Sequence, residues 1–445
     1  MHLSGRRFPA LLATAALYAA LCGIATGRTW VIHPDPTQPD NVIASVADQA
    51  ASGDTLQIEA GTYYEHINAE GKTLTFLGPE GAIATILDGS HPYGSGVGSV
   101  LYTGGRNPGV LRVVGLTIQN GQGTANQWGA TLGGGVCVDD AWGTSALYVS
   151  DCYFLDNAAL VDGLGGAIAV STSNTEQMRN CQFQGNLANH DGTALYAGGV
   201  GSIAILNCDI DLTGSRRSGV EVDGCDTLRI DDSNIHLEGT DWRFTMVYAS
   251  VANLLVHRNQ FLNLSQSSEG TMFDQEFNYL NDFLVPTEFE DNILWNKPWR
   301  PGDHPYVLNL GAPICDATVR RNTVVGGYVL CQLGGALDFG QNIVVNGRTG
   351  VFAPAGGCVC CNDIWPDSLV FEGGGATGDR NIKADPLFCG ADDGDFHIAH
   401  QSPCAAEHSP SGCGQIGALG EACDETPVEE TTWGQIKARF NRPAK

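Results

Sequence analysis

The chain has 445 residues, 58 of them glycine, with 16% charged residues and a formal net charge of −26. So much glycine and so few charges favour a turn-rich β protein over a helical one, and the length suffices for one large core or two ordinary domains. The negative charge argues against nucleic acid as a partner, because a polyanion is repelled unless metal ions bridge it.

Residues 1–27 predict a secretory signal peptide. Arg6 and Arg7 precede an apolar stretch at 8–23 that is too short to span a bilayer comfortably, and Ala25 and Gly27 provide the small residues of a cleavage site. No second transmembrane segment follows. We therefore expect a secreted protein that is extracellular, on the cell surface or in the periplasm, where disulfides are permissible.

Residues 40–53 predict a short helix ahead of the rest of the chain. Asp40 is a suitable N-cap and Gly53 a suitable end. The apolar face would consist of Val42, Ile43, Val46 and Ala50. We expect this helix to cover the N-terminal end of the following strands, whose edges would otherwise be exposed.

One pattern then recurs, in which a central residue has an apolar residue three places before it and another two places after it. The central residues are Cys152, Cys181, Cys208, Ser233, Asn259, Asn292, Asn322 and Asn342. Their spacing of 20–33 residues indicates a solenoid with one coil per repeat.

Two solenoid folds compete for this pattern. Residues 254–264 also match a leucine-rich repeat, but that fold needs a helical or similar convex segment in each repeat. Segments such as 163–173 and 218–225 are instead glycine-rich, and they alternate apolar with polar residues as short strands do. We therefore predict an all-β fold, a right-handed parallel β-helix, over residues 28–357.

The central residues would stack inside such a helix. Equivalent residues of successive coils lie about 4.8 Å apart, so asparagine side chains can pass amide hydrogen bonds along the column, and small thiols can fill the same position. The spacing leaves open whether neighbouring thiols form disulfides. The predicted structural ladder consists of Cys152, Cys181, Cys208, Asn259, Asn292, Asn322 and Asn342.

Residues 358–423 form a cysteine-rich end of the β-helix and its cap. Seven of the 15 cysteines lie here, but "CVCC" (358–361) lacks the two regularly spaced pairs of a zinc ribbon. A cap held by disulfides is therefore favoured over a metal site.

Residues 424–445 combine an acidic linker (424–430) with a basic, amphipathic helix. The apolar face of that helix would carry Trp433, Ile436 and Phe440. Three interpretations are open for this tail: it covers the last coil, it is disordered, or it is a sorting tag read by export or surface-attachment machinery.

Three segments near the N-terminus carry a family resemblance. "GDTLQIEAGTYYE" (53–65), "LTFLGPEG" (74–81) and "TILDG" (85–89) resemble the first coils of secreted proteins in the pectin lyase-like superfamily. Coils with "FLDN" (154–157) and "GGAI" (165–168) also resemble polymorphic outer-membrane protein repeats. The resemblance spans about residues 30–425 and implies a parallel β-helix.

The resemblance says less about activity. The superfamily includes lyases, hydrolases, esterases and non-catalytic surface proteins. Asp-Asp pairs occur at 139–140 and 231–232, but the Gly-His-Gly that a polygalacturonase would require is absent from the sequence.

The best candidate site comes from stacking neighbouring coils. Asp191 and Arg217 precede a strand in which alternation turns Glu221 and Asp223 outward. These four residues are the catalytic candidates, and Asp191, Glu221 and Asp223 are candidates for a calcium site, Ca²⁺ being the one cofactor that the sequence points to. The alternative is a solvated face with salt bridges at its rim.

Aromatic residues are the candidates for sugar binding, because their rings stack on pyranose faces. Trp295, Trp299 and Tyr306 cluster in the longest insertion, and Trp128, Trp142 and Trp242 lie in other loops. The alternative is that these rings fill gaps where a coil widens.

The leading function is that of a secreted or cell-surface protein that binds glycans or other surface molecules without catalysis. The rival is a calcium-dependent polysaccharide lyase or a glycoside hydrolase that acts on acidic polysaccharide. A groove with converging acids and arginine would favour the enzyme, and an unorganised polar face would favour the binding protein.

Overall fold

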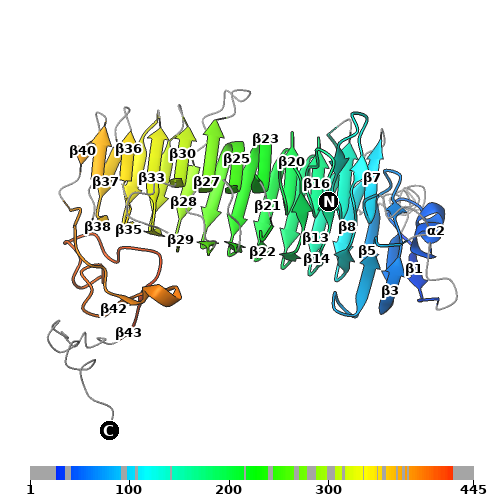
Figure 1. Ribbon diagram of the computed structural model, residues 1–445, viewed down its shortest axis with the longest axis horizontal. Coiled ribbons are helices and arrows are strands. Elements are labelled where there is room, and N and C mark those ends of the chain that lie inside the picture. Colours follow the sequence, from blue (N-terminus) through cyan, green and yellow to red (C-terminus); the bar gives the residue numbers. More distant parts are fainter. Residues whose placement is uncertain are drawn as a thin grey trace, which may run out of the picture.

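The structure is a computed structural model that describes residues 27–35, 42–91, 98–105, 109–140, 143–214, 217–238, 244–264, 270–277, 287–297, 306–312, 316–333, 335–347, 349–352, 357–366, 369–372, 376–377 and 380–423. These residues form the predicted right-handed parallel β-helix. Figure 1 shows the coils stacked along one axis, with helix α2 (Val42–Gln49) at one end and the C-terminal segment beside the last coils.

Three parallel sheets run the length of the solenoid. The first sheet contains β4 (Ile67–Asn68), β7 (Leu101–Gly105), β12 (Val136–Asp140), β16 (Ile168–Ser171), β20 (Leu195–Gly198), β27 (Gly270–Phe277), β30 (Tyr306–Ala312), β33 (Tyr328–Leu333), β36 (Thr349–Phe352) and β39 (Leu369–Glu372). The second contains β1 (Thr29–Ile32), β2 (Thr55–Ile58), β5 (Leu74–Leu77), β8 (Val110–Val114), β13 (Ala146–Ser150), β17 (Thr175–Arg179), β21 (Ser202–Leu206), β28 (Thr287–Glu290), β31 (Ala317–Arg320), β34 (Leu337–Gly340), β37 (Gly357–Cys360) and β40 (Ala376–Thr377). The long strands β23 (Ser218–Asp231) and β25 (Phe244–His257) run through both sheets and join them.

The strands of the third sheet follow those of the second sheet in the chain, after a short turn. It contains β3 (Gly61–Tyr64), β6 (Thr85–Asp88), β9 (Thr117–Gln119), β14 (Tyr153–Leu155), β18 (Gln182–Gln184), β22 (Asp209–Asp211), β24 (Asn234–Leu237), β26 (Gln260–Asn263), β29 (Ile293–Asn296), β32 (Thr323–Val325), β35 (Ile343–Val345) and β38 (Asp363–Trp365). Two further pairs of short strands lie outside these sheets. They are β10 (Thr124–Ala125) with β11 (Thr131–Leu132), and β15 (Ala158–Ala159) with β19 (Leu187–Ala188).

Strand alternation sends every second side chain into one continuous core. Residues of like shape stack at the coil spacing there. Phe154 of β14 and Phe183 of β18 are register partners, for example, and their parallel rings lie 4.9 Å apart between centroids. Each coil is therefore stabilised mainly by the coils on either side of it.

Asparagine side chains form a ladder at the interior corner between the second and third sheets. Asn259 Nδ2 donates to Asn292 Oδ1 at 3.0 Å, and Asn292 Nδ2 donates to Asn322 Oδ1 at 3.1 Å. The same contacts continue through Asn342, Asn362 and Asn381, the last two of which the sequence pattern did not include. Each side-chain oxygen also accepts the backbone N–H of the preceding rung, so the buried polar groups of these turns are satisfied.

Thiols occupy this corner in earlier coils. Cys152, Cys181 and Cys208 are buried and free, and each thiol donates to the carbonyl two residues before it, at 3.1, 3.2 and 3.5 Å respectively. Burial raises the pKa of the Cys152 thiol to about 12. The three thiols are therefore not joined in disulfides, and that of Cys152 stays neutral in the core.

The residue before each rung has a left-handed backbone. The φ angles lie between 52° and 61° at Asp151, Asn180, Asn207, Asp232, Arg258, Asp291, Arg321, Gln341 and Cys361. Asn and Asp tolerate this conformation better than other non-glycine residues, which explains their abundance at this turn. Some of these side chains pair along the axis, as Asn180 does with Asp151 at 3.0 Å and Arg321 with Asp291 at 2.7 Å.

Helix α2 covers the N-terminal coils as predicted, with Ile43 and Ala47 fully buried. Asp40, the predicted N-cap, lies outside the described residues. The carboxylate of Glu65, which is fully buried, accepts the N–H groups of Ile43 at 2.8 Å and Ala44 at 2.7 Å. A side chain from the next coil therefore satisfies the first turn of the helix, where backbone donors have no intrahelical partner.

We expect Glu65→Ala to lower the free energy of unfolding by roughly 2–6 kcal/mol, because the buried N–H of Ile43 and the partly buried N–H of Ala44 lose their acceptor at about 1–3 kcal/mol each. Urea denaturation measures the loss, and hydrogen exchange should show faster exchange within Val42–Gln49. Glu59→Ala is the control, since the side chain of Glu59 pairs with His33 at the surface. Equal midpoints for the two variants would contradict this role of Glu65.

Three disulfides hold the C-terminal region. The sequence left the pairing of these cysteines open. Cys358–Cys360 lies within β37, Cys361–Cys413 joins the last coils to the C-terminal segment, and Cys389–Cys423 joins two strands of that segment. Those strands belong to a small sheet of β41 (Phe388–Gly390), β42 (Asp395–Ala399) and β43 (Glu421–Cys423), with a 3₁₀ turn at Ala391–Asp393.

The C-terminal segment covers the side of the solenoid, on the outer face of the third sheet. Phe396 packs edge-on against Trp295 of β29, with ring centroids 5.4 Å apart, and Gln341 donates to the carbonyl of Cys413 at 2.6 Å. Gly417 approaches so closely that a Cβ there would lie 2.5 Å from Ile343. Figure 1 shows this segment beside β29, β35 and β38.

Some predictions fall outside the described residues. They concern the signal peptide up to residue 26 and the whole tail at 424–445. Within the described part of the chain, no helix is both long and apolar enough to cross a membrane.

Candidate functional site

The outward face of the first sheet carries two of the residues singled out from the sequence, Glu221 and Asp223, together with several tyrosines. Side chains of equal register form two outward columns along the axis. From β7 to β30 the first column contains Tyr102, Cys137, Ala169, Tyr196, Glu221, Tyr248, Asp274 and Asn309. The second contains Gly104, Asp139, Ser171, Gly198, Asp223 and Ser250. We call the stretch from Tyr196 to Asp274 the tyrosine–acid column, because the two kinds of side chain alternate in it.

Glycine in the second column makes room for tyrosine in the first. A Cβ at Gly198 would lie 3.0 Å from the phenol oxygen of Tyr196, and a Cβ at Gly104 would lie 2.4 Å from that of Tyr102. Each ring therefore leans along its own strand over the glycine two residues later. The result is a tyrosine held low on the surface of the sheet.

Carboxylates surround the Tyr196 phenol. Burial raises the pKa of Tyr196, and the negative charges of Asp223, Glu221 and Asp191 raise it further. Glu221 is the register partner of Tyr196 on the next coil, and Asp191 precedes β20. The phenol therefore stays protonated at neutral pH as a hydrogen-bond donor in a negative environment.

An ion-paired cluster borders this face where β20 and β23 begin. His190 Nδ1 pairs with the carboxylate of Asp191, and Arg217 Nη1 lies 2.7 Å from His190 Nε2. A guanidinium only donates, so these contacts place the imidazole proton on Nδ1 and the acceptor on Nε2. Asp191 and Arg217 are thus linked through His190, whose part the sequence did not assign.

The structure separates the members of the proposed calcium site. Asp191 is engaged by His190, while Glu221 and Asp223 lie in different outward columns of β23. Within the described ranges, no three His, Cys, Asp or Glu side chains gather closely enough to hold a metal ion. Calcium binding at these residues stays a prediction.

The three aromatic candidates have different environments. Trp295 is only 8% exposed and packs beneath Phe396 of the C-terminal segment, so its proposed role in stacking on sugar is corrected to a structural one. Tyr306 is 46% exposed and lies 6.0 Å from Tyr328 on the next coil, between ring centroids. Trp299 lies outside the described residues, as do Trp142, Trp242 and Arg216.

Trp128 is the most exposed of the described tryptophans that the sequence singled out, at 82%. It sits at the tip of the β10–β11 hairpin, where Asn126 Oδ1 accepts its backbone N–H at 2.9 Å and that of Ala130 at 3.0 Å. Leu132 at the base of the hairpin packs with Cys137 and Ala169 on the outward face of the first sheet. The hairpin therefore presents its tryptophan beside the same face.

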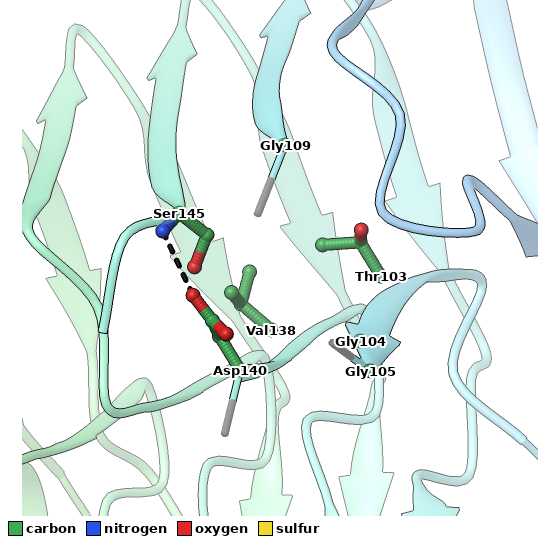
Figure 2. A pocket seen from close by; sticks show the side chains of 7 residues that line it. All are labelled: Thr103, Gly104, Gly105, Gly109, Val138, Asp140 and Ser145. Carbon is green, nitrogen blue, oxygen red and sulfur yellow. Dashed lines mark hydrogen bonds between the residues drawn. The ribbon is translucent and has the colours of Figure 1, made fainter. Parts of the chain in front are cut away.

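A small recess lies where β7 and β12 end. Figure 2 shows it lined by Thr103, Gly104, Gly105, Gly109, Val138, Asp140 and Ser145. Its one carboxylate, Asp140, accepts the N–H groups of Thr144 at 2.9 Å and Ser145 at 2.8 Å. The pair of carboxylates that glycoside hydrolysis requires is not present in this recess.

The tyrosines and carboxylates thus lie on the outward face of one sheet, in register from coil to coil. No family model matches the chain, and no curated protein matches it.

Proposed function

We propose that the protein is an extracellular or cell-surface solenoid that binds polysaccharide along the outward face of its first sheet and does not cleave it. The observation that carries the proposal is the tyrosine–acid column, which repeats aromatic and hydrogen-bonding groups in register along the axis. Tyrosine rings pack on the apolar faces of sugars, and carboxylates accept bonds from sugar hydroxyls. A linear polymer suits such a one-dimensional array.

Two further observations support the cellular location and the mode of binding. Three disulfides join cysteines of the C-terminal region, as is usual for proteins of oxidising compartments. Exposed aromatic side chains at Trp128 and Tyr306 lie on or beside the first sheet, so a long chain would meet several rings. Binding through many weak contacts raises overall avidity without a deep pocket.

The test is affinity electrophoresis of the full chain against a panel of neutral, acidic and amino polysaccharides, with and without calcium. We expect retention by at least one polymer, and no new reducing ends or unsaturated-uronate absorbance after incubation. Retention by none would refute the proposal, and product formation would favour the lyase or hydrolase instead.

We expect Tyr196→Ala combined with Tyr248→Ala to weaken the binding about tenfold or more, since each aromatic contact contributes on the order of 1 kcal/mol beyond its buried area. Gly198→Ala tests the same face without removing a ring, because its Cβ would displace the Tyr196 phenol. Tyr148→Ala is the matched control, since Tyr148 lies in the second sheet, 5.1 Å from the guanidinium of Arg112. An equal loss in the control would place the binding elsewhere.

A further inference from the structure

We propose that two copies of this chain form a dimer by exchanging their C-terminal segments, residues 388–423. Each segment then covers the apolar flank of the other copy, which is the outward face of the third sheet around Ile293, Trp295 and Ile343. The inference is independent of the proposed function. It starts from the way in which the C-terminal segment is joined to the solenoid.

The C-terminal segment is a unit with contacts of its own. Strands β41, β42 and β43 form its small sheet, and the disulfide Cys389–Cys423 closes it. The stack of coils likewise ends by itself at Ile382, whose N–H donates to the carbonyl of Asn362 at 2.7 Å. Each part therefore keeps its internal contacts when the two parts separate.

A short connector, residues 383–387, joins the two parts. The N–H of Ala384 donates to Asp363 Oδ1 of the solenoid at 3.0 Å, whereas the carbonyl of Pro386 accepts a hydroxyl of the C-terminal segment at 2.6 Å. Only Asp385 lies between these two attachment points. Asp385 precedes a proline, and a residue in that position favours an extended backbone. Short hinges under strain favour exchange between copies, because they have few residues over which to spread the strain.

The closed form strains the backbone where this connector ends. Leu387 has a φ of 53°, in the left-handed region that leucine rarely adopts. The chain then runs back over earlier coils, so that Phe396 meets Trp295, which stands three coils before Trp365 in the register of the third sheet. In the exchanged form the chain continues away from its own coils, and Leu387 takes an extended conformation. Exchange therefore relieves the same strain in both copies.

The end of the solenoid is where the second copy fits. Among the described strands, β39 and β40 are the last of the first and second sheets, and each pairs with one neighbour only, β36 and β37 respectively. Unpaired strand edges are surfaces to which another chain adds. Two copies that meet end to end at these edges, related by a two-fold axis, place the C-terminal segment of each beside the flank of the other.

The exchanged form keeps the contacts that the closed form makes. In the closed form Cys404 Sγ donates to Asp363 Oδ2 at 3.1 Å, and Gln341 Nε2 donates to the carbonyl of Cys413 at 2.6 Å. In the exchanged form the same groups come from two chains, and so does the disulfide Cys361–Cys413. Each such disulfide forms when two thiols give two electrons and two protons to one oxidised glutathione, which becomes two reduced molecules. The disulfide therefore records which chain covers which flank.

The experiment refolds an equal mixture of unlabelled full chain and full chain labelled with heavy nitrogen, in glutathione buffer at a series of protein concentrations. Size-exclusion chromatography separates monomer from dimer, and mass spectrometry identifies the disulfide-linked peptides in each fraction. We expect a dimer whose share rises with concentration. In this dimer about half of the Cys361–Cys413 peptide pairs should join a labelled to an unlabelled chain, because random pairing unites unlike chains half of the time.

The disulfide Cys389–Cys423 is the internal control. Both of its cysteines belong to the exchanged segment, so its peptide pairs should carry one kind of label in monomer and dimer alike. A dimer whose Cys361–Cys413 pairs also carry one kind of label has formed without exchange and would overturn the inference. A chain that stays monomeric at every concentration would overturn it too, and so would mixed labels at Cys389–Cys423, which indicate unspecific thiol oxidation.

A matched pair of variants tests the hinge. Leu387→Gly removes the strain of the closed form, because glycine adopts a positive φ freely. We expect its dimerisation constant to fall roughly tenfold or more, since each dimer relieves two such residues. Thr172→Gly is the control, because Thr172 has a φ of 50° in an exposed turn after β16 and lies outside the connector. An unchanged constant in Leu387→Gly, or an equal fall in both variants, would overturn strain at the hinge as the cause of exchange.

Discussion

Replacing Asn292 by leucine is expected to lower the free energy of unfolding by roughly 2–6 kcal/mol. Asn292 Oδ1 accepts the backbone N–H of Asn259 at 3.0 Å, and Asn292 Nδ2 donates to the carbonyl of Val256 at 2.8 Å. Both partners are backbone groups inside the solenoid, and each costs about 1–3 kcal/mol when it is left unsatisfied. Leucine has a similar size but supplies neither bond.

Urea denaturation measures the effect, and hydrogen exchange locates it. Because coils are stabilised by their neighbours, we expect faster exchange in the turns at Asn259 and Asn322 before the whole chain unfolds. Gln260→Leu is the control, since this amide lies next to the ladder in sequence and faces solvent. Identical midpoints for the two variants would show that the ladder contributes nothing.

A second large effect is expected at Glu176, whose carboxyl lies inside the solenoid. Glu176 is 1% exposed and stands in register between Leu147 and Ile203, two residues of the hydrophobic core. Its carboxyl bonds to the hydroxyl of Ser173, and its Oε2 has no hydrogen-bond partner. Burial raises the pKa of Glu176 well above its ordinary value, so the folded protein holds this carboxyl in its neutral form.

The pH dependence follows from that raised pKa. The folded state keeps the proton to a higher pH than the unfolded state. The stability that this proton contributes is therefore fully present below the pKa of the unfolded chain, about 4.5, and is lost as the pH rises above it. As the pH rises from there through the folded pKa, we expect wild type to lose stability relative to Glu176→Gln. The difference should grow by at most about 1.36 kcal/mol per pH unit.

Denaturation midpoints of wild type and Glu176→Gln across this pH range are the measurement. Glu176→Leu should also be at least as stable as wild type at neutral pH, because leucine continues the apolar column without a buried ionisable group. Parallel pH profiles for wild type and Glu176→Gln would contradict the expectation.

The repeat pattern was sufficient to predict the fold, because inward residues recur with a strict period in each strand. The apolar positions around Asn259 and Asn292 and the N-terminal helix follow from local signals that the structure reproduces. The same alternation, applied to β17, places Glu176 inward beside Met178. The sequence therefore contains the signal for a carboxyl inside the solenoid.

Much of the candidate site could not be predicted in this way. Coils differ in length, so the sequence does not state that Tyr196 is the partner of Glu221 or that Tyr248 follows it. Nor does it show that Trp295, which reads as a loop aromatic, ends under Phe396. The pairing of Tyr196 with Glu221 depends on the register between coils. The burial of Trp295 depends on a distant segment that folds back over it.

The sequence does contain one sign of the C-terminal segment that covers the third sheet. The outer face of the third sheet is polar in the middle coils, at Gln182, Gln184, Asp209, Asp211, Asn234 and Gln260, and apolar in the later ones, at Ile293, Trp295, Val325, Ile343 and Val345. An apolar outer face in a solenoid predicts that something covers it.

The cover has a consequence for the order of synthesis. Residues 388–418, which lie over Ile293, Trp295 and Ile343, are made after the coils that they shield. Until they emerge, a growing chain that has already formed those coils displays a strip of apolar side chains along one flank, which is the kind of surface through which nascent chains associate. Ribosomes that stop before residue 388 would therefore release a solenoid with most of its coils complete and a flank prone to aggregate.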